Sequence, residues 1–314
     1  MKWRLKATGQ NLVDKLPPAL SSPSYYHMQR HFGGLKDFTP IKELSNSVFI
    51  LKDIKRTKCD FAGKIFLEIG TGHTVNVPIG LWLAGASRVI TVDLNPYLKE
   101  ELVAESLQYI FQNRNEIRLL FSDVANNAEL DEKLKFLCEK KDTPASLFES
   151  MNLQYLTPVN VGCLPIVDHC VDFHVSIDVL EHIPSNLISS LLYEAKRVLA
   201  IGGLLVHRIT LSDHFAHSDP SISGINFLQF SEEDWLNLAG NKFMYHNRLR
   251  ALEFEKLFDD HGVTVLSKEK RLDQRALTLL RNGFPVNTLF TRYPPEELAA
   301  SALNVVGGFT KERG

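Results

Sequence analysis

Short apolar runs alternate with helix-like segments between residues 64 and 210, and this alternation constrains the fold more than any other feature. The runs that predict strands are Lys64–Ile69, Arg88–Asp93, Leu153–Val159, Val171–Ile177 and Leu204–Ile209. The segments that predict helices between them include Val77–Gly85, Tyr97–Phe111 and residues 185–199. Strands that alternate with helices form a parallel sheet with right-handed crossovers. We therefore predict an α/β fold built on a doubly wound sheet.

Other regions are less regular. Residues 115–150 contain a candidate strand, Ile117–Phe121, and a short amphipathic helix, Leu130–Cys138. The pair Gly202-Gly203 is expected to end the preceding helix with a left-handed cap. Near the C-terminus, Val263–Lys268 and Leu303–Thr310 are strand-like runs that we expect to close one edge of the sheet.

The composition excludes several classes of protein. The chain has 314 residues, 44% of them apolar, and a net charge of −2, which argues against a disordered chain and a basic nucleic-acid coat. Its four cysteines lack a C-x-x-C pair, which indicates free thiols in a reducing compartment. No apolar run reaches the roughly 18 residues of a membrane span, and the basic start lacks the apolar core of a secretory signal. We expect a cytoplasmic globular protein.

A glycine-containing turn follows the first predicted strand. The sequence LEIGTGHT places Glu68 two positions before Gly70, and Gly72 two positions after it. Glycines at a strand–helix turn let the backbone approach a ligand closely. Val75 occupies the place of the third glycine in a dinucleotide fingerprint, so the turn does not predict a diphosphate site. Asp93, at the end of the second strand, can accept hydrogen bonds from both hydroxyls of a ribose.

These motifs together resemble a known family. The Glu-x-Gly-x-Gly turn, the Val-Asp strand end and the segment VDFHVSIDVLEHIP are similar to class I S-adenosylmethionine-dependent methyltransferases over about residues 60–210. Thr74 stands where that family has its third glycine. The resemblance implies a Rossmann-like seven-stranded sheet, mostly parallel with one antiparallel edge strand. It also implies S-adenosyl-L-methionine as cofactor and methyl transfer to O or N of a small polar acceptor, such as a sugar or a natural product.

The resemblance assigns roles to individual residues. Gly70 and Gly72 would lie against the methionine part of the cofactor, and Glu68 would support the loop or the amino group. Asp123 and Asn160 compete for the adenine contact, and we prefer Asn160 because it stands four residues before a Leu-Pro pair, as in the family. The implied cofactor-binding residues are Glu68, Gly70, Thr71, Gly72, Asp93, Leu94, Asn160, Val161 and Asp178.

Polar residues after the fifth strand are candidates for handling the acceptor. His207, Asp213 and His214 are the predicted catalytic residues, because they lie near the expected mouth of the sheet and histidine titrates near neutral pH. An aromatic and basic segment follows, and it resembles a type 11-like bacterial branch of these methyltransferases that is often placed among glycan or natural-product enzymes. Its predicted acceptor-binding residues are Tyr245, His246, Asn247 and Arg248.

A metal site is a further possibility at the segment after the fourth strand. Asp178, Glu181 and His182 resemble the Glu-x-x-Glu-His segment that binds a divalent metal in some small-molecule and RNA 2′-O-methyltransferases, with His207 or His214 as a further ligand. A Glu-His pair is also common at this place without metal. We therefore favour the interpretation that His182 caps or packs and binds no metal.

The chain is interpreted as an N-terminal helical lid, residues 1–60, and a methyltransferase domain, residues 61–314, with insertions at about 113–150 and 211–247. In the lid, Tyr25, Tyr26, Gln29 and Arg30 either cover the cofactor or pack on the sheet edge.

Two alternative functions stay open. One is RNA methylation, and the other is a catalytically inactive binding protein with the same fold. The net charge of −2 disfavours the first, and the intact Gly70, Gly72 and Asp93 set disfavours the second. The basic residues that would serve RNA binding are Lys242, Arg248, Arg250, Lys268, Lys270, Arg271 and Arg275.

Overall fold

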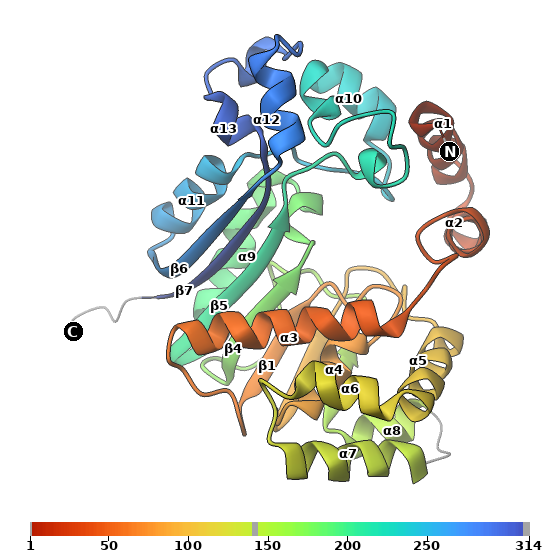
Figure 1. The fold of residues 1–314 in the computed structure, drawn as a ribbon, viewed down its shortest axis with the longest axis vertical. Coiled ribbons are helices and arrows are strands. Elements are labelled where there is room, and N and C mark those ends of the chain that lie inside the picture. The colour runs from red at the N-terminus through yellow and green to blue at the C-terminus, as the bar shows by residue number, and fades with distance from the viewer. Residues whose placement is uncertain (1, 140–143, 310–314) are drawn as a thin grey trace.

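The computed structural model describes residues 2–139 and 144–309, and within them seven strands form one sheet (Figure 1). The strand order is β3-β2-β1-β4-β5-β7-β6. The strands are β1 (Ile65–Ile69), β2 (Arg88–Val92), β3 (Leu153–Leu156), β4 (Val171–Ile177), β5 (Leu199–Thr210), β6 (Val263–Leu272) and β7 (Ala300–Phe309).

The first five strands pair in parallel, whereas β7 runs antiparallel to both of its neighbours, β5 and β6. The predicted Rossmann-like sheet, mostly parallel with a reversed strand at one side, is confirmed. The reversed strand β7 lies one place in from the edge, which is formed by β6.

Helices and short 3₁₀ turns connect the strands. No helix among the described residues is both long enough and apolar enough to cross a membrane. The α-helices are α1 (Trp3–Asp14), α2 (Pro18–Phe32), α3 (Pro40–Arg56), α4 (Asn76–Leu83), α5 (Glu100–Gln112), α6 (Arg114–Phe121), α7 (Asn127–Glu139), α8 (Pro144–Ser150), α9 (Ser185–Val198), α10 (Glu232–Ala239), α11 (Ala251–Asp260), α12 (Gln274–Arg281) and α13 (Pro295–Leu298). The 3₁₀ turns are η1 (Leu180–His182), η2 (His214–His217), η3 (Asn226–Gln229) and η4 (Thr288–Phe290).

The sheet is covered on both faces because successive strand residues point to opposite sides. In β1, Phe66 joins a core formed with α3 and α4, whereas Leu67 joins a second core formed with α9 and α11. Figure 1 shows α3 crossing the near face and α9 behind the sheet. A third core joins Trp3 of α1 to aromatic residues such as Phe215 and Trp235. The N-terminal helix therefore packs on the C-terminal half of the chain.

Two local expectations were wrong. Residues Ile117–Phe121 belong to helix α6 rather than to a strand. Ile117 and Phe121 are buried while Leu119 between them is 75% exposed, which fits a helical period and not the alternation of a strand. Gly202, with a φ of 84°, does not cap a helix, because α9 already ends at Val198 and both glycines lie in β5.

Candidate functional site

The turn between β1 and α4 has the backbone geometry that its glycines permit. Gly70 and Gly72 have φ angles of 87° and 67°, values that residues with a side chain rarely adopt. A Cβ atom on Gly70 would lie 2.5 Å from Val179, so this position requires glycine for packing as well. A Cβ atom on Gly72 would meet no atom within 4 Å, so the backbone there borders open space.

Asp93 lies directly after β2, where it faces the same turn. One carboxylate oxygen accepts the Gly72 N–H at 2.9 Å, and the other accepts the Asn95 N–H at 2.9 Å. These bonds fix the carboxylate and leave further lone pairs for hydroxyl donors. Burial raises the pKa of Asp93, and its two backbone donors oppose that shift. Leu94 follows it with 61% of its surface exposed.

Glu68 lies beneath the turn rather than at the surface. Its side chain is buried and accepts a hydrogen bond of 2.5 Å from the Thr91 hydroxyl, which in turn lies 2.6 Å from the Thr71 hydroxyl. Burial raises the pKa of Glu68 to about 8, so the isolated carboxyl is largely protonated at neutral pH. This arrangement supports the turn from below and can ionise beside a cationic group.

The segment after β3 completes this end of the sheet. The Val159 N–H donates to the Asp93 carbonyl at 2.9 Å, which holds the segment beside Asp93. Asn160 and the half-buried Val161 follow, and the Asn160 amide oxygen accepts the Gly162 N–H at 2.9 Å. The competing candidate Asp123 lies after α6 instead, where it pairs with Lys52 of α3 and is 72% exposed. Its position does not fit the end of a strand.

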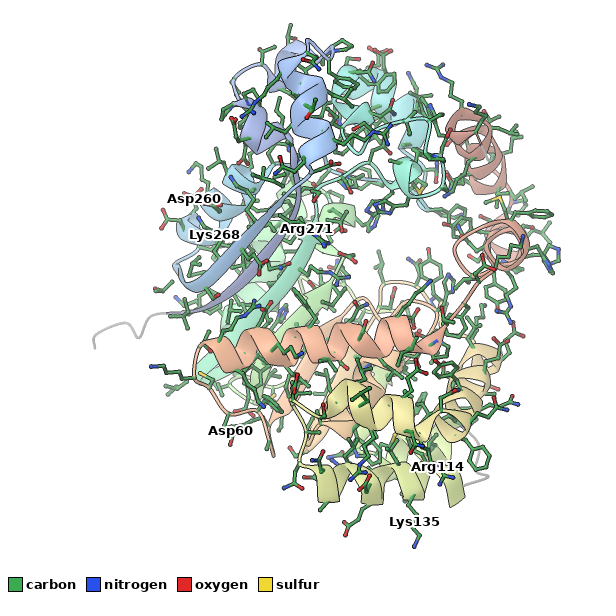
Figure 2. The ribbon with its side chains drawn as sticks, viewed as in Figure 1. Asp60, Arg114, Lys135, Asp260, Lys268 and Arg271 are labelled. Carbon is green, nitrogen blue, oxygen red and sulfur yellow. The ribbon has the colours of Figure 1, made fainter. Side chains whose placement is uncertain are left out.

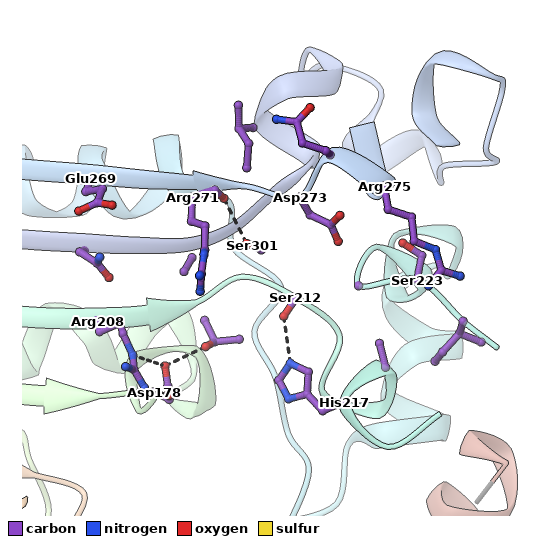
Figure 3. A pocket seen from close by; sticks show the side chains of 18 of the residues that line it. Asp178, Arg208, Ser212, His217, Ser223, Glu269, Arg271, Asp273, Arg275 and Ser301 are labelled. Atoms are coloured by element: carbon purple, nitrogen blue, oxygen red, sulfur yellow. Dashed lines mark hydrogen bonds and ion pairs between the residues drawn. The ribbon is translucent and has the colours of Figure 1, made fainter. Parts of the chain in front are cut away.

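Asp178 follows β4 and faces a large cavity (Figure 3). The Arg208 guanidinium donates to both of its oxygens, at 2.6 and 3.2 Å, and the Thr210 hydroxyl donates at 2.8 Å. The Asp178 backbone has a φ of 54°, a left-handed conformation that is uncommon for non-glycine residues but that aspartate adopts more readily than most. The structure therefore holds this carboxylate firmly at the carboxyl end of the central strands.

The cavity has a volume of about 970 Å³ and is lined by both positively and negatively charged side chains. Figure 3 shows Arg271 and Asp273 entering it from the end of β6, opposite Arg208 and His217. Burial lowers the pKa of His217, whose Nε2 lies 3.3 Å from the Ser212 hydroxyl. Such a lining suits a polar molecule that both donates and accepts hydrogen bonds. The other charged lining residues are Glu269 and Arg275.

The predicted catalytic residues do not line this cavity. His207 is 1% exposed, lies 2.8 Å from the Ser176 hydroxyl and stacks on Phe258, on the face of β5 opposite to Arg208. Asp213 is fully buried and accepts from the Phe215 N–H and the Asn226 amide, at 2.8 and 2.9 Å. Both side chains are buried and bond to other parts of the protein. These positions do not fit the predicted catalytic role of His207 and Asp213.

His214 has a different environment. Its side chain is 17% exposed, and its Nε2 lies 3.7 Å from a carboxylate oxygen of Glu181. Burial lowers its pKa well below the usual value. It lies beside the cavity-lining His217 but does not line the cavity itself.

The predicted acceptor-binding residues also support the fold. Asn247 donates to the Leu180 and Ile183 carbonyls at 2.8 and 2.9 Å, and so fixes η1. Arg248 is 2% exposed and donates to the Phe227 and Phe230 carbonyls at 3.0 and 2.8 Å. The remaining residues of this set, Tyr245 and the buried His246, are not among the cavity-lining residues.

Helix α2 bridges the glycine turn and the segment near residue 243. Tyr25 stacks on Phe243 with ring centroids 3.9 Å apart, whereas the Tyr26 ring lies 5.7 Å from that of His73 in the glycine turn. Arg30 forms an ion pair with Glu105 of α5. The helix thus touches the turn, α5 and the segment near residue 243.

Sequence reasoning missed the contribution of α3. Glu43 accepts from the Asn76 amide at 2.8 Å and from the Thr74 hydroxyl, and Asn46 accepts from Arg208 at 3.0 Å. Phe49 lies under the Arg208 guanidinium, 5.4 Å from it. The spacing of Glu43, Asn46 and Phe49 every three residues places them on one helix face, and this was the available signal.

The basic residues considered for RNA binding do not form one surface. Arg248 and Arg250 are buried, and the other members divide between ion pairs and the cavity. The lysine pairs are Lys242 with Asp14, Lys268 with Glu255 and Lys270 with Glu297. Arg271 and Arg275 line the cavity, while Arg114 and Lys135 lie at the other end of the molecule (Figure 2).

Solved structures with a similar fold include several methyltransferases. A candidate methyltransferase from Bacillus halodurans C-125 is 12% identical, with 82% of this chain and 97% of that chain covered and a TM-score of 0.43. A geranyl diphosphate C-methyltransferase from Streptomyces coelicolor A3(2), solved with Mg²⁺, geranyl diphosphate and S-adenosyl-L-homocysteine, is 12% identical, with coverages of 84% and 78% and a TM-score of 0.45. A geranyl diphosphate methyltransferase solved with S-adenosylmethionine is 10% identical, with 85% of each chain covered and a TM-score of 0.46.

No protein-family model matches the chain, and no curated protein matches it.

Proposed function

We propose that this chain is an S-adenosylmethionine-dependent methyltransferase that methylates O or N of a small polar acceptor. The observation that carries the proposal is the pairing of Gly72 and Asp93. The open space above Gly72 and the carboxylate fixed 2.9 Å from its N–H form a cradle for a ribose at the carboxyl ends of two parallel strands. The resemblance of the surrounding motifs to class I methyltransferases supports the same interpretation.

The residues at this end of the sheet suit the parts of that cofactor. Asp93 would accept from the ribose hydroxyls, Asn160 would face the adenine, and Gly70 and Gly72 would border the methionine part. Burial raises the pKa of the Glu68 carboxyl, and a nearby cation such as an amino group would oppose that rise and pair with the ionised form. When bound, the cofactor supplies an electrophilic methyl group on a sulfonium, and its neutral thioether leaves as the acceptor bonds to the methyl carbon.

The contribution of the cavity is to position the acceptor. Asp178, fixed by Arg208 and Thr210, lies at the boundary between the cofactor end of the sheet and the cavity. Aligned reactants can gain about 7–11 kcal/mol from positioning, more than the roughly 3–5 kcal/mol of a general base. His217 lines the cavity, and because burial lowers its pKa its ring is neutral at pH 7 and able to accept a proton.

We further propose that residues 1–60 contribute to cofactor enclosure through α2, and that the catalytic domain follows from residue 61. The contacts of Tyr26 with His73 and of Arg30 with Glu105 support this role for the helix. The segments 113–150 and 211–247 are proposed as the insertions that distinguish this domain, and the second supplies cavity residues such as His217.

The test is transfer of a labelled methyl group. The purified chain is incubated with methyl-labelled S-adenosylmethionine and the small-molecule fraction of a cell extract. We expect label in a polar small molecule, and we expect Arg271→Ala to slow the transfer at limiting acceptor while leaving cofactor binding unchanged. Arg118→Ala, which alters an exposed arginine on α6, is the matched control. Absence of label in any fraction, with a chain that binds the cofactor, would favour the inactive binding protein instead.

A further inference from the structure

Three side chains with metal-ligating atoms converge beside the cavity. Glu181 and His182 come from η1, and His214 comes from η2 after the next strand. Each offers one ligand atom, and these atoms lie within 4.8 Å of one another. Two turns that are about 30 residues apart in the chain therefore form one group, because β4 and β5 are neighbours in the sheet.

His182 is in the tautomer that can bind a metal. Its Nδ1 lies 2.7 Å from the Tyr245 carbonyl oxygen, which can only accept, so Nδ1 carries the hydrogen and Nε2 keeps a lone pair. A hydrogen bond of this kind also fixes the orientation of a ligating ring.

The buried polar atoms of the group are unsatisfied. Glu181 is fully buried, and one of its carboxylate oxygens accepts only a long bond of 3.3 Å from the Thr210 N–H. Its other oxygen and His214 Nε2 have no hydrogen-bond partner among the described residues. Two ligand atoms of the group therefore lack a hydrogen-bond partner, and a cation between them would satisfy both.

The neighbouring His246 differs from His182, because its Nδ1 accepts a hydrogen bond rather than donating one. The His246 ring packs 5.1 Å from that of His214, but its Nδ1 accepts the Arg248 N–H at 3.1 Å. Its Nε2 therefore carries the hydrogen and is a donor. The positive charges of Arg248 and Arg250 also act on His246 and add to the lowering of its pKa by burial.

We propose that Glu181, His182 and His214 bind a divalent first-row transition metal such as Zn²⁺. Two imidazoles and one carboxylate favour this ion over Mg²⁺ or Ca²⁺, which prefer oxygen ligands. Two ligand atoms about 2.1 Å from a tetrahedral metal lie about 3.4 Å apart, so even the widest pair needs to approach by only about 1.4 Å on binding.

Three protein ligands leave a coordination position open. Thr210 donates to Glu181 and also lines the cavity, so the metal site and the cavity are adjacent. An oxygen atom of water, or of a molecule in the cavity, would fill the open position. Metal binding itself does not depend on the proposed methyl transfer.

The test is a titration of the chelator-treated full chain with Zn²⁺ by calorimetry, with Co²⁺ as a spectroscopic substitute. Glu181→Gln keeps the side-chain size and an acceptor for Thr210, and His214→Gln removes one imidazole. The matched control is the double variant His27→Ala/His31→Ala, because these exposed histidines of α2 have ring centroids 4.2 Å apart and are the best alternative chelating pair.

We expect one Zn²⁺ per chain, a visible Co²⁺ spectrum and a higher Tm with metal. Each site variant is expected to weaken binding by at least about 100-fold and to lose the Tm increase, whereas the control keeps both. If circular dichroism shows that one site variant does not fold, the result with the other variant tests the proposal. The proposal is overturned if the wild type does not bind one ion, if both folded variants bind like the wild type, or if the control loses the site. S-adenosylhomocysteine binding, measured separately, tests the proposed function alone.

Discussion

Successive side chains of β5 point alternately toward the cavity and toward the core behind the sheet. Arg208 and Thr210 line the cavity, whereas His207, one position before Arg208, packs against Phe258 in the opposite core, as strand alternation requires. The chemistry of histidine made His207 a candidate in the sequence, but the sequence alone did not reveal which face of this strand is enclosed. The places of Asp178 and Asp93 in the fold were easier to predict, since each directly follows a strand whose end was clear from the apolar pattern.

The carboxyl group of Glu68 gives a prediction about pH. Burial raises its pKa from 4.5 to about 8, so folding favours the protonated form. The stability associated with this group is present below about pH 4.5 and is lost as pH rises through about 8. Glu68→Gln removes the titration, so its Tm relative to the wild type should increase from about pH 5 to about pH 8 and then level off.

Thermal unfolding followed by circular dichroism at several pH values measures this difference. Glu132→Gln, which changes an exposed acid of α7, is the control and should show no such trend. A constant difference between Glu68→Gln and the wild type across this pH range would show that Glu68 keeps an ordinary pKa.

Among the elements, the strands of the sheet were predictable from the sequence, whereas helix α6 and the segment near residue 245 were not. The strand runs, the order of strands and helices and the two closing strands followed from apolar patterns and from the resemblance. Helix α6 was missed because Ile117, Leu119 and Phe121 satisfy the period of a strand, and only the exposure of Leu119 distinguishes the two. The acceptor role of the segment near residue 245 was inferred from side-chain type, which does not distinguish a binding arginine from a buried arginine that holds loop carbonyls.

Arg248 provides a test of that distinction. Its guanidinium is buried and donates to carbonyls of the η3 segment, including Phe227 and Phe230. Arg248→Ala leaves these acceptors unsatisfied, so we expect the free energy of unfolding to fall by at least about 2 kcal/mol in urea titrations. Arg281→Ala, an exposed arginine paired with Glu296, should change it by less than about 1 kcal/mol. Equal stabilities of the two variants would contradict the structural role.

At the scale of the whole molecule, the site is assembled from distant parts of the chain. The cavity draws on α3, the ends of β4 and β5, the 211–225 segment, β6 and β7. Helix α2 reaches from the glycine turn to Phe243, and α1 packs on the C-terminal core. These contacts join residues more than 200 positions apart, so no local pattern in the sequence could have located the cavity or its lining. The positions of the glycine turn and Asp93 were predictable because both belong to one compact β–α–β unit.

The most direct test of the account is binding of S-adenosylhomocysteine by calorimetry to the wild type, Asp93→Ala and the control Asp123→Ala. Loss of charge-assisted hydrogen bonds is worth roughly 1.5–3 kcal/mol, so Asp93→Ala should bind about 10–150-fold more weakly. Asp123 is 72% exposed after α6, where it pairs with Lys52, and its variant should bind like the wild type. No detectable binding to the wild type, or equal affinity for wild type and Asp93→Ala, would contradict the account.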